Sequence, residues 1–356
     1  MTTTKTVIGT WLHAETKETE SYYPQVGGAP SSSAFQDIYW RCVMLFFASS
    51  VRHNPQAVHR LYTTVSQVPD VAGFSTGHFL RRLNVEVVQV PFTYLPPLGY
   101  HGSWRNQFYI LDIIRYLDRQ GASDEQHVIL DSDCVFTGSI EPLSRDLSRA
   151  GLLALDLGLP LDEDINGLTQ RDMKQVFEEI GLPCSGEAAT YYGGEFFAAT
   201  AEVISRLAGE IEPLWETCLA RFEAGRPKFN EEAHFLSFLY AKLGYREASA
   251  NPYIGRIWTG RKFQTASVKD FNLIIWHVPA EKKHGIKRLI PQVIQPASPF
   301  WTVPPGQEFA QYVAGYIGIP KSSLWKKSCD VFDTVLWRLA DKGRSQNKPT
   351  KENIKT

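Results

Sequence analysis

Cysteine is scarce in this sequence, and no two cysteines have the spacing of a metal site. The 356 residues include five cysteines, Cys42, Cys134, Cys184, Cys218 and Cys329, and none of them belongs to a CxxC motif. An odd number of scattered thiols excludes a disulfide scaffold and a zinc knuckle, because both need paired cysteines at regular spacing. We expect free thiols, of the buried kind that persists in a reducing compartment.

A surplus of positive charge and a long apolar run are also absent. Lys and Arg total 37 and Asp and Glu total 38, so the net charge is −1. Binding to nucleic-acid phosphates needs a basic surplus, and no nucleic-acid partner is expected. The longest apolar runs, such as Val43–Ala48 and Phe271–Trp276, fall far short of the ~20 residues that span a membrane. Residues 1–18 lack the apolar core of a signal peptide, so we expect a cytoplasmic protein, with peripheral contact to the inner face of a membrane left open.

The sequence does contain the apolar content and the pattern of an α/β domain. Hydrophobic residues make up 43% of the chain, which excludes disorder throughout. Segments typical of strands alternate with segments typical of helices, and this predicts a mixed, mostly parallel central sheet flanked by helices. Strands are expected at Val7–Leu12, Cys42–Ala48, Val85–Val90, His127–Leu130, Gly151–Leu155, Tyr191–Ala198 and Phe271–Val278. Helices are expected at residues 54–65, Ser103–Leu117, residues 173–180, Ala201–Ala224, Asn230–Leu243 and Ser322–Leu339.

The same pattern divides the chain into four parts. Residues 1–35 are expected to form an irregular N-terminal extension with a Gly- and Ser-rich loop, and residues 36–300 the main α/β domain. Residues 301–341 are expected to be a C-terminal helical segment, and the polar, basic residues 342–356 a flexible tail.

The last predicted helix, Ser322–Leu339, is amphipathic and leaves two interpretations open. Its basic residues, together with the basic tail, would suit peripheral contact with anionic lipid. Asp330 and Asp333 dilute that positive face, and they favour packing of the helix on the parent domain instead.

The most informative segment is VILDSDCVF, residues 128–136, in which Asp131 and Asp133 follow an apolar strand. Ligands of open α/β sheets bind beyond the carboxyl ends of the strands. Two adjacent carboxylates repel each other unless a hard cation such as Mn²⁺ or Mg²⁺ accepts their oxygens. Such a cation, bridged to a diphosphate, makes the diphosphate a better leaving group. Taken alone, the pair is equally well explained by aspartates that end a strand and form a turn.

VILDSDCVF resembles the strand and DxD element of GT-A fold, nucleotide-sugar-dependent glycosyltransferases. Two later segments are similar to motifs of the retaining family-6 transferases, the blood-group and α-galactosyl type. Tyr191–Ala198 with Glu202–Leu207 resembles YYxGAFFGG…EVxRL, and FNEEAHFL at residues 229–236 resembles WHDESHL. The resemblance covers roughly residues 100–245. It implies a GT-A-like fold for residues 36–300 and metal-dependent, retaining transfer from a nucleotide-diphosphate sugar, with a UDP-sugar the expected donor. The acceptor would be a glycan, a lipid-linked glycan or a protein.

The resemblance assigns roles to several side chains. Asp131 and Asp133 would bridge the metal to the diphosphate, and Glu232 would stabilise or attack the anomeric carbon. Glu195 stands where the family has a small residue, at the acceptor side formed by Tyr191–Glu195. It would therefore alter which acceptor fits or take part in the reaction itself. Glu232 has a structural alternative as well, since Asn230 is a good helix N-cap and a glutamate favours the first helical turn.

A further segment is similar to the family-8, glycogenin-like pattern iiHxxGxxKPW. Ile274–His277 matches the apolar strand and the histidine, which implies His277 as a third metal ligand and Lys283, six residues on, as a contact of the diphosphate. Ala280 replaces the glycine, and His284-Gly285 replaces Pro-Trp. The alternatives are a histidine packed behind Trp276 and a lysine in a solvated loop.

Two more binding residues are predicted from position. Arg105 lies at the start of the predicted helix Ser103–Leu117, where the resemblance places a basic residue near the sugar and diphosphate, and Arg suits bidentate phosphate contacts. Ser49 follows the predicted strand Cys42–Ala48, where base and ribose would bind. No glycine fingerprint of the dinucleotide kind is present, which argues against a Rossmann dehydrogenase.

Two rival functions remain open. Asp131–Val135 also fits the hhhDxDx[TV] signature of haloacid-dehalogenase-type phosphotransferases, with Asp131 as nucleophile and Asp133 as acid/base. The later Ser/Thr, Lys and acidic pair of that family cannot be placed in order, and the acidic cluster Asp162–Asp164 comes too early. The other rival is a non-catalytic protein that binds a nucleotide-sugar.

Overall fold

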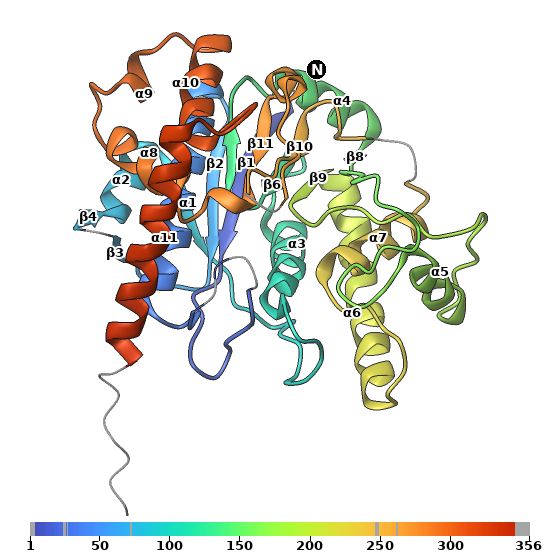
Figure 1. Ribbon diagram of the computed structural model, residues 1–356. Coiled ribbons are helices and arrows are strands. Elements are labelled where there is room, and N and C mark those ends of the chain that lie inside the picture. The colour runs from blue at the N-terminus through green and yellow to red at the C-terminus, as the bar shows by residue number, and fades with distance from the viewer. Residues whose placement is uncertain are drawn as a thin grey trace, which may run out of the picture.

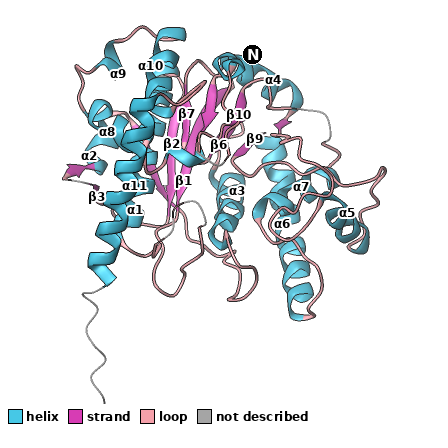
Figure 2. Cartoon of the chain, viewed as in Figure 1, coloured by secondary structure: helices cyan, strands magenta, loops and turns pink. Residues whose placement is uncertain are grey.

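The centre of the protein is a mixed six-stranded sheet with helices on both faces (Figure 1, Figure 2). The computed structural model describes residues 4–23, 26, 28–71, 73–245, 249–260 and 263–335, and the backbone of residues 336–345. Within these residues the strand order is β5-β2-β1-β6-β9-β8. The strands are β1 Lys5–Leu12, β2 Val58–Thr63, β5 Val85–Gln89, β6 Glu125–Leu130, β8 Leu152–Leu153 and β9 Phe196–Thr200.

The strand order reverses beside β1. The chain runs from β1 outward through β2 to β5, and then returns to place β6 on the other side of β1, with all four strands parallel. β9 then pairs antiparallel with β6, and β8 antiparallel with β9. In open α/β sheets the ligand crevice lies at such a reversal, outside the carboxyl ends of the two strands. A ligand site is therefore expected at the residues that follow β1 and β6.

A second, three-stranded sheet begins immediately after the acidic pair. Its order is β10-β11-β7, where β7 is Cys134–Phe136, β10 is Ile254–Arg256 and β11 is Ile275–His277. β11 runs antiparallel to β7 and parallel to β10. A short hairpin of β3 Asp70–Val71 and β4 Phe74–Ser75 lies outside both sheets.

The main sheet separates two hydrophobic cores. Successive residues of β6 point to opposite faces, as in any strand, so Val128 and Leu130 belong to one core and Ile129 to the other. The first core is built with α1 Ser33–His53, α2 Thr76–Arg82, α4 Glu141–Ala150, α8 Gly285–Ile294, α9 Pro299–Thr302 and α10 Gln307–Ile317. The second is built with α3 Tyr109–Gln120, α5 Gln170–Glu179, α6 Ala201–Glu223 and α7 Glu232–Lys242. Three 3₁₀ turns, Arg105–Phe108, Val268–Asn272 and Pro279–Glu281, and the last helix α11, Leu324–Ser345, complete the described elements.

The structure corrects two predicted elements. Cys42–Ala48 is not a strand but the middle of α1, where every residue is buried. A short apolar run fits a buried helix as well as a buried strand, and here α1 is covered by the sheet on one side and by α8 and α10 on the other. Residues 54–65 are not a helix, because α1 ends at His53 and residues Val58–Thr63 form β2.

The predicted division of the chain is wrong at its N-terminal end, whereas the segment 301–341 is helical as expected. Residues 1–35 are not an extension, since β1 is an inner strand of the main sheet. Helix α10, within the predicted C-terminal segment, packs in the same core as α1. Three predicted strands also become shorter or move: Gly151–Leu155 to β8, Tyr191–Ala198 to β9, and Phe271–Val278 to β11 after a 3₁₀ turn. The predicted tail 342–356 lies mostly outside the described residues.

The expectation of an α/β fold with a mixed central sheet is confirmed. The sheet is mixed and flanked by helices, and helices lie near the other predicted positions. All five cysteines are free. Among the described residues, no helix has both the length and the apolar character needed to cross a membrane.

Candidate metal and active site

A cavity of about 620 Å³ opens where the strand order reverses. Leu12 and His13, at the end of β1, and Asp131, directly after β6, are among the residues that line it. Loops from the second half of the chain form the opposite wall. The predicted acidic pair is therefore in the position that the topology favours for a ligand.

Strand register brings His277 to the acidic pair. In the antiparallel pairing of β7 with β11, His277 stands opposite Cys134, the residue after Asp133. His277 Nε2 consequently lies 3.3 Å from Asp133 Oδ2 and 3.8 Å from Asp131 Oδ2. One ligand atom from each of the three residues falls within 4.8 Å of the others. The structure thus assembles Asp131, Asp133 and His277, which the sequence proposed as a ligand set.

Glu195 supports the other side of the same imidazole. It comes just before β9, which pairs with β6, so its carbonyl accepts the N–H of Asp131 at 3.1 Å. Its Oε1 lies 3.2 Å from His277 Nδ1, and Arg256 donates to both of its carboxylate oxygens at 2.6 Å. A carboxylate on the far nitrogen of a ligating histidine fixes its orientation and tautomer. Glu195 is therefore buried and paired behind His277, and the expectation that it forms the acceptor edge is not supported.

The charges of this cluster shift its pKa values in opposite directions. Burial and the nearby Asp133 charge raise the pKa of Asp131 to about 6. Burial alone would raise the pKa of Asp133 too, but Lys282 and His277 hold it below its ordinary value. Burial opposes the charge of His277, yet Asp133 and Glu195 raise its pKa to about 9. A protonated His277 thus supplies a positive charge beside the carboxylates of Asp133 and Glu195.

The lysine of the site is Lys282 and not Lys283. Lys282 Nζ donates to Asp133 Oδ2 in a buried ion pair. Lys283 is directed elsewhere and donates to the carbonyl of Val26 at 2.7 Å. The family pattern predicts Lys283, six residues after His277, but beyond the 3₁₀ turn Pro279–Glu281 it is Lys282 that lines the cavity.

Glu232 lies at the N-terminus of α7 in the wall of the cavity and is 3% exposed. Two consecutive glycines make room for the carboxylates of this wall. A Cβ at Gly193 would collide with the Glu195 carboxylate, and a Cβ at Gly194 with the Glu232 carboxylate. The side-chain amide of Gln107, turned with its nitrogen inward, lies 2.6 Å and 3.1 Å from the two oxygens of Glu232.

Glu232 has no cationic partner among these contacts. Burial and the neighbouring Glu231 charge raise the pKa of Glu232 well above its ordinary value. The protonated form of this carboxyl group is therefore favoured more strongly than in an exposed glutamate. Glu231 is buried beside it and accepts hydrogen bonds from Asn166 and, at 2.9 Å, from Tyr191. Asn230 does not cap α7, because the N-cap position is Glu231 and Asn230 donates to the carbonyl of Asn166.

Two predicted binding residues do not line the cavity. Ser49 is expected at the exit of a strand, but it lies within α1. Its hydroxyl donates to the carbonyl of Phe46 and accepts from the N–H of Phe136. Arg105 lies behind the lining residue Trp104 and donates through Nε to the carbonyl of Pro96 at 2.5 Å. Both side chains hold backbone in place and reach no cavity surface in this structure.

The cavity wall is rich in aromatic and acidic side chains. The lining aromatic residues are Trp11, Tyr23, Phe35, Tyr39, Trp104, Tyr191, Trp258 and Phe263. The lining carboxylates are Glu15, Asp131, Asp133, Asp156, Glu163, Asp164, Glu195, Glu231 and Glu232, whereas Arg256 and Lys282 are the Arg and Lys side chains among the described lining residues. Flat apolar surfaces with a few convergent polar groups are typical of small-molecule sites. The excess of negative charge favours a ligand that is positively charged or that binds together with a cation.

Sequence analysis missed four residues of this site: Gln107, Glu231, Arg256 and Lys282. Glu231 and Lys282 are adjacent to Glu232 and Lys283, which the motifs predict. The motifs therefore identify the right segments but not these two residues. Arg256 lies on the three-residue strand β10, opposite His277, and no sequence pattern marks it. A scan against protein-family models finds no match, and no curated protein matches the chain.

Proposed function

We propose that this protein is a metal-dependent glycosyltransferase that takes its sugar from a nucleoside diphosphate sugar, with a GT-A-like fold. The observation that carries the proposal is the meeting of Asp131, Asp133 and His277 at the carboxyl edge of the sheet where the strand order reverses. The resemblance of the three sequence motifs supports it further. A UDP-sugar is the expected donor, and retention of configuration is the expected outcome.

The three residues fit a divalent cation chemically. Two carboxylates and one imidazole are a donor set that Mn²⁺ accepts readily and Mg²⁺ accepts with water. His277 Nε2 is buried and makes no well-directed hydrogen bond, although it lies 3.3 Å from Asp133. When bound there, the metal would neutralise negative charge that develops on a departing diphosphate.

The protein's own residues would orient the donor. Lys282 ends beside Asp133, where its ammonium group can contact a diphosphate once Asp133 is engaged by a metal. Arg256 and Glu195 keep His277 facing the carboxylates. The aromatic side chains near the end of β1, such as Trp11 and Tyr39, offer surfaces for a flat base.

Glu232 is the residue proposed to act at the sugar. It lines the same cavity as the acidic pair, and a carboxylate there stabilises or traps an oxocarbenium-like centre. Its raised pKa favours the protonated carboxyl group, whereas only the ionised carboxylate can act in this way. Positive charge brought in by metal and donor lowers the pKa of a nearby carboxyl, so ionisation of Glu232 would be coupled to their binding.

The acceptor side is proposed to bind hydroxyl groups. Asp156, Glu163 and Asp164 are exposed at the cavity rim and can accept hydrogen bonds from a polyol. Trp258 and Phe263 pack edge to face at 5.7 Å on the same rim, and such rings offer an apolar face to a sugar. A glycan, a lipid-linked glycan or a glycosylated protein would suit this surface.

The test is a thermal-shift screen of nucleoside diphosphates and their sugars with and without Mn²⁺, followed by a transfer or donor-hydrolysis assay. We expect Mn²⁺-dependent stabilisation by UDP or a UDP-sugar, and turnover that Asp133→Asn removes. A phosphotransferase would instead hydrolyse phosphate esters and be stabilised by phosphate mimics on Asp131. Tight binding of a nucleotide-sugar without turnover towards any acceptor or water would make the protein a binding module.

A further inference from the structure

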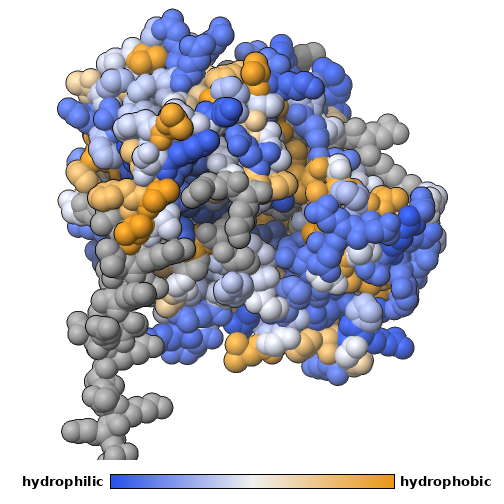
Figure 3. Space-filling view, viewed as in Figure 1, coloured by the Kyte–Doolittle hydropathy of each residue, from blue (hydrophilic) through white to orange (hydrophobic). Residues whose placement is uncertain are grey.

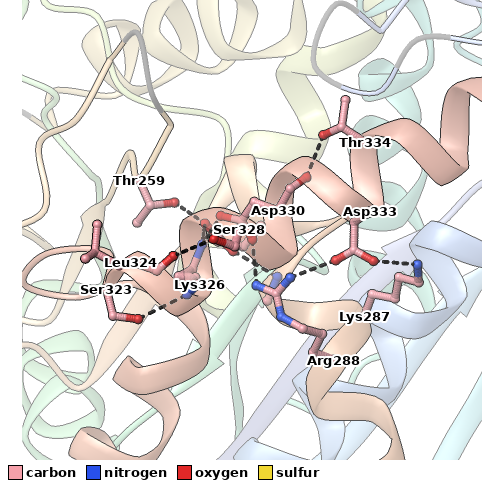
Figure 4. A network of polar contacts seen from close by, with 12 residues as sticks. Thr259, Lys287, Arg288, Ser323, Leu324, Lys326, Ser328, Asp330, Asp333 and Thr334 are labelled. Atoms are coloured by element: carbon pink, nitrogen blue, oxygen red, sulfur yellow. Dashed lines mark hydrogen bonds and ion pairs between the residues drawn. The ribbon is translucent and has the colours of Figure 1, made fainter.

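The C-terminal helix α11 packs on the protein through its charged face. Lys326 is fully buried and pairs with Glu281 at 2.9 Å and with Asp330 at 2.8 Å. On the next turn, Asp333 pairs with Lys287 and Arg288, and Arg288 also pairs with Asp330 (Figure 4). His284, Asp330 and Asp333 lie close enough to suggest a metal site, but the two carboxylates are already neutralised by Lys and Arg side chains of the protein.

This arrangement leaves the apolar face of α11 in solvent. Eleven large hydrophobic side chains are exposed among the described residues, and five of them belong to α11. They are Leu324, Trp325, Val331, Phe332 and Val335, with exposed fractions from 47% to 83%. Residues spaced by three, four and seven positions share one side of a helix, so these five form a single stripe. Figure 3 shows hydrophobic surface gathered over α11, and Figure 1 shows α11 on the outside of the layer of α1 and α8.

The stretch of sequence that contains α11 is positively charged. From Lys321 to the end of the sequence there are nine Lys and Arg residues and four Asp and Glu residues, whereas the whole chain carries −1. Asp330 and Asp333 are turned inward, while Lys327 on α11 and Lys321, three residues before the helix, are exposed. The surface that α11 offers to a partner therefore combines aromatic and aliphatic side chains with uncompensated positive charge.

We propose that α11 docks the protein on a lipid bilayer that contains anionic headgroups. A helix with aromatic and aliphatic residues on one face and cations beside them lies in the plane of such an interface, with its apolar face among the acyl chains. A second copy of the chain is a poorer occupant, because a two-fold contact would bring two basic helices and tails together. The proposal is independent of the proposed catalytic function, since no residue of the stripe lines the cavity.

The test is co-sedimentation of the full chain with vesicles of phosphatidylcholine, alone or mixed with phosphatidylglycerol. We expect binding to the mixed vesicles only, weakened by added salt. Trp325→Ser combined with Phe332→Ser should reduce the partition constant at least about tenfold, because two large apolar groups no longer enter the bilayer. The matched control is Leu98→Ser with Val268→Ser, which removes two similarly exposed apolar side chains outside α11 and should bind as the wild type does.

Three results would overturn the proposal. The wild type would fail to bind anionic vesicles, or the Trp325/Phe332 variant would bind them as well as the wild type. The third is a concentration-dependent dimer in analytical ultracentrifugation that the same variant abolishes, which would assign the stripe to a second copy of the chain. Lys321→Glu with Lys327→Glu provides a second measure, since it leaves the apolar stripe intact and should still lose binding to anionic vesicles.

Discussion

Glu195 lies 3.2 Å from His277 and binds it on the nitrogen opposite to the one that faces Asp131 and Asp133. Glu195 directly precedes β9 of the main sheet, and His277 is the last residue of β11 in the second sheet. Arg256 donates to both carboxylate oxygens of Glu195. The ring of His277 therefore has one orientation available. Two aspartates at the end of a strand are common. Here the contact with Glu195 orients His277 beside them as a third candidate ligand.

Replacing Glu195 tests whether this orientation serves metal binding. We expect Glu195→Gln to weaken Mn²⁺ affinity about 10- to 100-fold, as is usual when the outer partner of a histidine ligand is altered. Isothermal titration with Mn²⁺ measures the effect directly and needs no substrate. Glu187→Gln is the matched control, because Glu187 pairs with Arg171 on the exposed surface. Unchanged Mn²⁺ affinity in Glu195→Gln would exclude a supporting role.

Asp133→Asn should remove metal-dependent turnover and also reduce stability. The variant leaves the Lys282 ammonium buried without its partner, and breaking a buried ion pair on one side costs about 3–5 kcal/mol. The double variant Asp133→Asn with Lys282→Met removes the stranded charge and should recover part of the free energy of unfolding, but no activity. Urea denaturation measures the stability of both variants. Equal stability of the single and double variants would contradict the ion pair, and retained metal-dependent activity would contradict the assignment of Asp133.

The acidic pair and His277 could be predicted because each is a chemically distinctive residue at the end of an apolar segment. Arg256 and Lys282 could not, because their positions depend on the pairing of three-residue strands and on a 3₁₀ turn between His277 and Lys282. Such short elements have no periodicity of their own. Their place is decided by long-range packing.

The fold followed from the sequence wherever hydrophobic residues had a clear period or a clear boundary. Helix α1 was not predicted, because its central residues are apolar on all sides and show no helical period. That uniform burial reflects a helix enclosed between the sheet and a further layer. Misplacing α1 also misplaced Ser49, since its assignment depended on a strand end. The sequence also does not show that the charged face of α11 turns inward. The residue that pairs with Asp330 and Asp333 is Arg288 of α8, far away in the sequence.

The two glycines beside the cavity permit a test of Glu232 that leaves its own chemistry unchanged. Gly194→Ala places a methyl group against the Glu232 carboxylate, and we expect it to reduce turnover sharply and stability by about 1–3 kcal/mol. Gly209→Ala, at an exposed position of α6 with open space around it, is the control and should stabilise by about 0.5–1 kcal/mol. Turnover of both variants measured at saturating donor separates the loss of activity from the change in stability. Full activity in Gly194→Ala would show that the position of Glu232 is not critical.

Buried neutral histidines predict that stability falls in mild acid. Burial lowers the pKa of His59 and of His127 to about 4, from 6.5 in an exposed chain. Between these values the unfolded chain binds more protons than the folded one. The contribution of these two histidines to the free energy of unfolding is therefore fully present above pH 6.5 and is lost as the pH falls towards 4. Each histidine adds at most ~1.4 kcal/mol per pH unit to the slope. Urea denaturation across this window measures the slope, and His127→Gln should reduce it by one histidine's share, whereas the exposed His78→Gln should leave it unchanged. A slope that His127→Gln does not alter would mean that the burial of His127 is not coupled to folding.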